Sequence, residues 1–169
     1  MMSMAKGITS GYFPVGAALM GEKVADVFEN SNSPEAGIFH GYTYSAHPVG
    51  AAAVCACLSE TQRISTKDNA GVRGKQLYEG ILKLKKKFNV IGDVRGGQGL
   101  MAAIEVVSDQ KKKTAMSMDE MKKLHQSTYE AGAMVRLGLN NILMSPPLVI
   151  SEAEVDQILD ALDYGFSSM

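Results

Sequence analysis

This chain is organised around the segment Ala5-Lys6-Gly7-Ile8-Thr9-Ser10-Gly11-Tyr12-Phe13-Pro14-Val15-Gly16-Ala17. Lys6 stands between small residues, and Gly7, Gly11 and Gly16 make the backbone after it permissive. Such a backbone allows a lysine ammonium to be aimed at a buried site without steric conflict. Taking that group out of water frees the amine as a nucleophile toward carbonyl compounds. The alternative is a solvated lysine, since lysines are surface residues as a rule.

A second block of polar and aromatic residues follows, Phe39-His40-Gly41-Tyr42-Thr43-Tyr44-Ser45-Ala46-His47-Pro48-Val49. The first segment, with Ser3-Met4-Ala5-Lys6-Gly7, Thr9-Ser10-Gly11 and Pro14-Val15-Gly16-Ala17, resembles the pyridoxal phosphate attachment segment of class III aminotransferases. The second block resembles the segment that follows it in that family. Two such blocks in the right order are more specific than one motif. Within the family, the residues of these blocks are most similar to the omega-amino-acid:pyruvate enzymes. The resemblance covers essentially this whole chain but less than half of a complete family member.

The resemblance implies an α/β fold, namely the C-terminal portion of a fold-type I pyridoxal-phosphate-dependent transferase. Residues 1–62 would be the C-terminal piece of the cofactor-binding large domain, with part of its sheet. Residues 63–169 would be the small C-terminal α+β domain. The implied reaction moves an amino group from an omega-amino acid or amine to pyruvate or a similar oxo acid. An aminomutase or a decarboxylase of the same fold stays an alternative.

The resemblance also assigns the cofactor site. Lys6 would bind pyridoxal phosphate through its amine and then act as the general base, while the cofactor serves as the electron sink. Thr43 matches the threonine that binds the cofactor phosphate, which in the family occurs across a dimer interface. Its hydroxyl and the neighbouring backbone N–H groups are suitable neutral donors. Tyr42 would lie near the same phosphate.

Arg136, in Val135-Arg136-Leu137-Gly138, matches the family arginine that receives a substrate carboxylate. A guanidinium offers two parallel N–H groups to a carboxylate, so it distinguishes acids from plain amines. The alternative is a surface arginine or one that is held in an ion pair. Its place between apolar strand residues favours the binding role.

The sequence departs from the family pattern in two respects. Ala46 stands where many relatives have glycine, although the omega-amino-acid branch accepts alanine. The family's aspartate at the pyridinium nitrogen, its ring-stacking aromatic residue and its Gly-Ser phosphate loop precede the lysine, and this sequence does not contain them. We therefore expect the chain to be inactive alone and to act as a homodimer or with a complementing chain. A non-catalytic folded module that acts through subunit contacts is the alternative.

Composition excludes several other classes of function. With 17 basic and 18 acidic residues the formal charge is -1, which argues against nucleic-acid or membrane-surface binding. No apolar run has the length of a membrane span and no signal peptide is visible, which indicates a cytoplasmic protein. Cys55 and Cys57 fall on different faces of a predicted helix, so we expect buried, unpaired thiols. The three histidines (His40, His47, His125) lack metal-ligand spacing, and we expect no metal.

Patterning predicts the remaining elements. Strands are expected at 2–5, at the buried run 16–20, at 134–137 and at 142–144. Asn140 and Asn141 are suited to positive φ in the turn between the last two strands. A strand-turn-strand unit covers 90–107, with Met101, Ala103 and Glu105 on its buried strand. Expected helices cover 22–28, 48–63, 71–87, a helix ending near 130 after a capping box at Ser117, and a final helix after a second capping box at Ser151.

Overall fold

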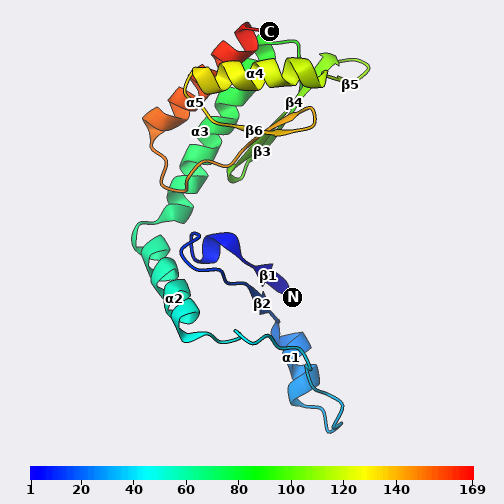
Figure 1. Ribbon diagram of the computed structural model, residues 1–169, viewed down its shortest axis with the longest axis vertical. Coiled ribbons are helices and arrows are strands. Elements are labelled where there is room, and N and C mark those ends of the chain that lie inside the picture. Colours follow the sequence, from blue (N-terminus) through cyan, green and yellow to red (C-terminus); the bar gives the residue numbers. More distant parts are fainter. The chain divides into compact units, whose positions relative to one another are not determined.

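Residues 1–169 are described by a computed structural model, in which the chain divides into two units, Met1–Ile64 and Ser65–Met169. The predicted boundary lies between residues 62 and 63, two residues before this division. Figure 1 shows the course of the chain through both units. That the first unit belongs to a large cofactor domain and the second is a small domain stays a prediction.

The first unit contains a two-stranded ribbon and three helical segments. The ribbon pairs β1 with β2 in antiparallel fashion, with Ser3 opposite Ala18. The elements are β1 (Met2–Met4), a 3-10 turn η1 (Lys6–Ile8), β2 (Ala17–Leu19), α1 (Glu22–Glu29) and α2 (Pro48–Arg63). Pro48 stands in the first turn of α2, where its missing N–H costs nothing. The strands and helices predicted for this part of the sequence are thus confirmed.

The first unit has almost no interior. Thr9 and Gly50 are its only buried residues. The strand predicted as buried, β2, is largely exposed. Of the two thiols predicted as buried, Cys55 is exposed and Cys57 is half-buried, so these predictions of burial are wrong. The physical reason is that β2 pairs only with β1, and no other element of the unit covers the ribbon.

The second unit has mixed α/β structure around one antiparallel sheet. Its elements are α3 (Thr66–Lys87), β3 (Ile91–Gly97), β4 (Gly99–Asp109), β5 (Thr114–Ala115), α4 (Met118–Glu130), β6 (Arg136–Gly138), β7 (Asn141–Met144) and α5 (Glu152–Ser167). The strand order is β3-β4-β7-β6, and the short β5 pairs with β4. Helix α3 packs on β3 and β4, and α5 packs on both α3 and α4 (Figure 1).

The helices cover one face of this sheet. On β4 the residues Leu100, Ala102, Ile104 and Val106 are buried, and they join Leu77, Ile81, Met121, Leu124, Val155 and Leu162 of the helices in one core. Successive strand residues point to opposite faces. The strand is buried on one face as predicted, but Met101, Ala103 and Glu105, the residues named for it, are not on that face: Met101 is 76% exposed, and Ala103 and Glu105 are half-buried. These side chains lie on the sheet face that no helix covers.

Helix starts agree with the predicted caps, with one difference. Ser151 and Glu154 form the complete reciprocal capping box of α5. At α4 the Ser117 hydroxyl accepts from the Glu120 amide, but the Glu120 carboxylate accepts from that hydroxyl instead of the backbone. Helix α3 begins at Thr66, earlier than expected, since Ser65 adopts a left-handed conformation just before it.

Two turns join the strands of the second unit. At the end of β3 the glycines Gly96, Gly97 and Gly99 all have positive φ, which confirms the predicted tight turn. Between β6 and β7 the positive φ falls on Leu139 (57°) and not on Asn140 or Asn141, so that prediction is wrong. Gly138 and Asn141 are paired across the turn, so Asn141 is a strand residue and the turn consists of Leu139 and Asn140. The side chain of Asn140 donates to the Val106 carbonyl at 3.2 Å, which holds the turn against β4.

Candidate functional site

Lys6 lies immediately after the ribbon strand β1, on a constrained turn. Ala5 is extended, and Lys6 then takes a left-handed conformation with φ of 54°. The amides of Ile8 and Thr9 donate to the carbonyls of Ala5 and Lys6, which closes the turn η1. The Lys6 side chain is exposed and makes no hydrogen bond or ion pair. The first unit thus has nothing that desolvates the amine, contrary to the reasoning from its sequence.

Side-chain contacts hold the loop that follows Lys6. The Thr9 hydroxyl, in a side chain only 2% exposed, donates to the Phe13 carbonyl at 2.7 Å. From helix α2, the Cys57 thiol donates to the Gly7 carbonyl at 3.7 Å, and its sulfur lies 3.2 Å from the Ser10 hydroxyl. Sequence reasoning treated Cys57 only as a buried, unpaired thiol and did not predict its contacts with the loop. No local pattern could have found it, because its contacts are 47 and 50 residues away.

Tyr42 and Thr43 lie together in a turn just before α2. The Tyr42 amide donates to the Ser45 hydroxyl at 3.0 Å, and the Ser45 amide donates to the Tyr42 carbonyl at 2.9 Å. Ala46 takes φ of 56°, a conformation that favours glycine. The side chains of Tyr42 and Thr43 are exposed, and the Tyr42 hydroxyl lies 3.1 Å from Nε2 of His40.

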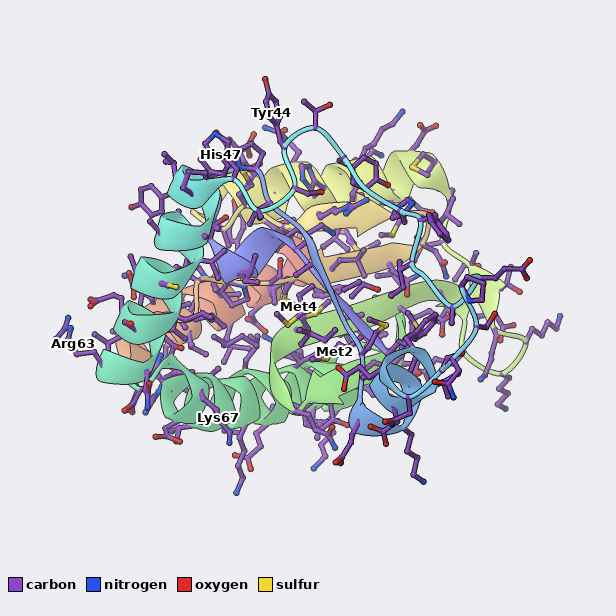
Figure 2. The ribbon with its side chains drawn as sticks, turned by 90° about the horizontal axis from the view of Figure 1, so that it is seen from below. Met2, Met4, Tyr44, His47, Arg63 and Lys67 are labelled. Carbon is purple, nitrogen blue, oxygen red and sulfur yellow. The ribbon has the colours of Figure 1, made fainter.

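His47 joins this turn to helix α2. Its Nδ1 accepts from the Gly50 amide at 3.4 Å and so caps the helix. Its ring lies against Phe13, with centroids 5.4 Å apart, and meets the edge of Tyr44. Figure 2 shows Tyr44 and His47 beside the start of α2 and Arg63 at its end. Sequence reasoning placed His47 in the second block and found no metal-ligand spacing for it, but did not predict the cap, although a histidine directly before a helix-opening proline is in a position to cap.

A cavity of about 490 Å³ lies in the first unit between these two loops. Residues from the lysine loop (Phe13, Pro14, Val15, Gly16) and from the second turn (Tyr42, Tyr44, Ser45, Ala46, His47) line it, together with Gly50 and Ala51 of α2. No hydrogen bond or ring contact joins Lys6 to Tyr42 or Thr43. Tyr42 and Thr43, which are consecutive in the chain, therefore share a turn, and neither is hydrogen-bonded to Lys6.

Arg136 opens the edge strand β6 of the second unit. In the strand register Arg136 of β6 is opposite Leu143 of β7, and Leu143 is opposite Ala103 of β4. Ala103 is in turn opposite Arg95 of β3. Directly opposed residues share a face, so Arg136 and Arg95 lie on the uncovered face of the sheet. Arg95 donates to Asn141 at 2.6 Å and lies near Asp93, whereas the exposed Arg136 guanidinium has no such contact.

A larger cavity, of about 750 Å³, lies beside Arg136. Its lining is mostly apolar and comes from the β6 and β7 edge and from α4 and α5: His125, Met134, Val135, Leu143, Met144, Pro146, Pro147, Ile150 and Ile158 are among it. His125 Nε2 lies 2.9 Å from the Val135 carbonyl, which ties α4 to the segment before Arg136. An unpaired guanidinium at the rim of an apolar cavity suits a ligand with a carboxylate and an apolar body.

No group of three or more His, Cys, Asp or Glu side chains is arranged to hold a metal ion. None of the helices combines the length and the apolar character that crossing a membrane requires.

Comparison with known proteins gives a consistent result over the whole chain. The family profile described as Aminotransferase class-III matches residues 1–164. An uncharacterized aminotransferase of Sinorhizobium fredii is 36% identical over 94% of this chain. A taurine–pyruvate aminotransferase of Bilophila wadsworthia is 30% identical over 100% of it. A crystal structure of an amine transaminase from an uncultivated Pseudomonas species, in its pyridoxal-phosphate-bound form, superposes with a TM-score of 0.91 at 36% identity over 98% of the chain.

The chain spans only part of each of these proteins. It covers 35% of the Sinorhizobium relative, 39% of the Bilophila relative and 37% of the Pseudomonas chain.

Proposed function

The chain belongs to the class III aminotransferase family, and from this premise we propose that it supplies Lys6, Tyr42, Thr43 and Arg136 to a pyridoxal-phosphate-dependent transaminase. The proposed reaction moves an amino group from an omega-amino acid or amine to pyruvate or a similar oxo acid. The observation that carries the proposal is Lys6 itself. Its primary amine is unpaired, and it stands on a hydrogen-bonded turn at the start of a segment that contains Gly7, Gly11 and Gly16.

The side chains present fit two ends of the cofactor. The unpaired amine of Lys6 suits an aldehyde, and the exposed hydroxyls of Thr43 and Tyr42 suit a phosphate as neutral donors. When bound, pyridoxal phosphate supplies the electron sink for a carbanion. The rest of its site would come from outside this sequence, either from the remaining length of a complete family member or from a partner chain.

Each residue then has a distinct role. Lys6 holds the cofactor covalently, and its freed amine acts as the general base that moves a proton at the substrate carbon. Thr43 and Tyr42 orient the phosphate. Arg136 binds the substrate carboxylate through its paired N–H groups, because no acidic side chain of the second unit occupies them.

Reductive trapping tests this proposal. The purified chain is incubated with pyridoxal phosphate, borohydride then supplies the hydride that reduces the C=N bond, and peptides are analysed by mass spectrometry. We expect the pyridoxyl adduct on Lys6 in preference to Lys23, an exposed lysine of α1 in the same unit. Lys6→Arg should abolish the adduct at that position and leave labelling of Lys23 unchanged. Equal labelling of both lysines would refute the proposed role of Lys6.

One observation favours a second function, that of a non-catalytic module acting through subunit contacts. The first unit exposes large apolar side chains, among them Tyr12, Phe39, Tyr44 and Val49, and such surfaces mark contacts with other chains. Sedimentation of the chain with and without cofactor separates the two functions. Self-association without preferential Lys6 labelling would favour the module.

A transamination assay with pyruvate, in the chain supplemented with its complementing part, separates amino transfer from aminomutase or decarboxylase chemistry.

A further inference from the structure

The strain in the lysine loop has to be maintained by contacts with other residues. Lys6 and Ser10 both have left-handed φ values, 54° and 49°, and neither is glycine. Such conformations cost free energy and persist only where the surroundings hold them. The unit offers little burial for this purpose, since Lys6, Gly7 and Ser10 are all exposed. Specific hydrogen bonds therefore have to do what packing does elsewhere.

Cys57 is the side chain outside the loop that makes those bonds. A thiol has one hydrogen. When the Cys57 thiol donates it to the Gly7 carbonyl at 3.7 Å, the Ser10 hydroxyl, 3.2 Å from the sulfur, is left to act as the donor to that sulfur. The Gly7 carbonyl also accepts from the Ser10 amide at 3.2 Å. One side chain of α2 thus binds the loop at Gly7, the residue after the left-handed Lys6, and at the left-handed Ser10.

We propose that Cys57 is a positioning residue for Lys6. Through Gly7 and Ser10 it fixes the backbone from which the Lys6 amine projects, so that the amine meets the cofactor aldehyde in one direction. The inference rests on the function proposed for Lys6, and it adds a residue with no chemical role of its own. Helix α2 then does more than support the fold, because its thiol sets the geometry of the reactive loop.

The chain contains its own control for this proposal. Cys55 lies two residues before Cys57 on α2, is exposed, and makes no hydrogen bond with the loop. Cys55→Ala therefore removes a thiol from the same helix without touching the lysine loop. Cys57→Ser is the conservative variant, since its hydroxyl retains one donor and one acceptor. Cys57→Ala removes both.

Two measurements on the full chain test the proposal. The first is the NMR signature of positive φ at Lys6, namely its carbon shifts and its strong intraresidue Hα–HN NOE. The second is the ratio of pyridoxyl adduct on Lys6 to adduct on Lys23. Cys57→Ala should abolish the NMR signature and lower the adduct ratio by about threefold to tenfold, the factor that corresponds to one lost hydrogen bond.

Cys57→Ser should stay near the parent chain, and Cys55→Ala should equal it. If Cys57→Ala behaves like Cys55→Ala in both measurements, the proposal is overturned. It is also overturned if labelling of Lys6 and Lys23 changes in parallel, since that is the result of general loosening of the unit. If the parent chain shows no preference for Lys6 but Cys57→Ala still removes the positive-φ signature, the anchoring is supported and only the function proposed for Lys6 fails.

Discussion

Gly74 of α3 lies against the backbone carbonyl of Gly99 in β4, so closely that a Cβ atom on Gly74 would overlap the carbonyl oxygen. This contact sets the distance between the helix and the sheet at the turn that joins β3 to β4. The neighbouring Gly71 of the same helix has no atom within 4 Å of its Cβ position. The two glycines therefore make a matched pair with opposite expectations.

Gly74→Ala should destabilise the second unit, because the overlapping atom belongs to backbone and cannot rotate away. We expect a loss of about 1–3 kcal/mol in the free energy of unfolding, the usual effect of overpacking. Gly71→Ala should instead stabilise by about 0.5–1 kcal/mol, because alanine loses less backbone entropy in a helix. Urea unfolding followed by circular dichroism measures both, and equal effects of the two substitutions would contradict the close contact.

Gly165 of α5 and Thr128 of α4 should show strong coupling. A Cβ at Gly165 would overlap the Thr128 hydroxyl, which donates to the Leu124 carbonyl at 2.8 Å in the interior. Gly165→Ala should cost about 1–3 kcal/mol. In the double variant with Thr128→Ala the overlap is gone, so the total loss should be smaller than the sum of the single losses by about 1–2 kcal/mol. If the two single losses add strictly in the double variant, α4 and α5 can move apart at this contact without a further loss of stability.

The capping box of α5 should make stability depend on pH. Hydrogen bonds from the Ser151 amide and hydroxyl hold the pKa of the Glu154 carboxyl below its ordinary value of 4.5. Because the folded-state pKa is depressed, the stabilisation is present above pH 4.5 and is lost as the pH falls through the folded-state pKa. Glu154→Gln should therefore lower the free energy of unfolding at neutral pH. This loss should become smaller as the pH falls below 4.5. Thermal unfolding of both proteins across this range measures it, and a difference that is constant with pH would argue against the box.

Arg136 and Arg95 should respond differently to carboxylates. Both lie on the uncovered sheet face, but Asn141 and Asp93 engage only Arg95. Titration of the ¹⁵N-arginine-labelled chain with pyruvate should shift the Nε–H resonance of Arg136 and leave that of Arg95 in place. The chain has only four arginines, so the signals can be assigned by substitution. Arg136→Lys should weaken the response because an ammonium cannot bind a carboxylate in bidentate fashion.

Much of the fold follows from local sequence signals. Capping residues predicted the starts of α4 and α5, and Pro48 predicted the start of α2, because each of these signals acts on the next few residues alone. The inward face of β4 did not follow. Its residues Leu100 to Val106 are apolar at both parities save for Glu105, so the alternation that indicates the inward face rests on one residue. Packing of α3 on the other face covers Leu100, Ala102, Ile104 and Val106.

The site shows the same division. The two sequence blocks drew attention to Lys6, Tyr42 and Thr43 through contiguous residues. The contacts that shape their loops, from Cys57 and His47, join segments far apart in the chain or depend on ring packing. The Lys6 side chain is exposed and not desolvated as expected, because the burial of a side chain depends on which elements pack against it. A unit that buries only Thr9 and Gly50 cannot supply it from its own residues.

The hairpin of β3 and β4 has a consequence for how the second unit acquires its structure. Its strands turn within a single residue, Gln98, whereas β7 reaches β4 only after α4 has been passed. Closing a short loop costs less chain entropy than closing a long one. The segment from α3 through β4 is therefore the nucleus on which we expect folding to begin. During synthesis this segment leaves the ribosome before the later elements of the second unit, from β5 to α5. Those elements can then pack onto it once they have emerged.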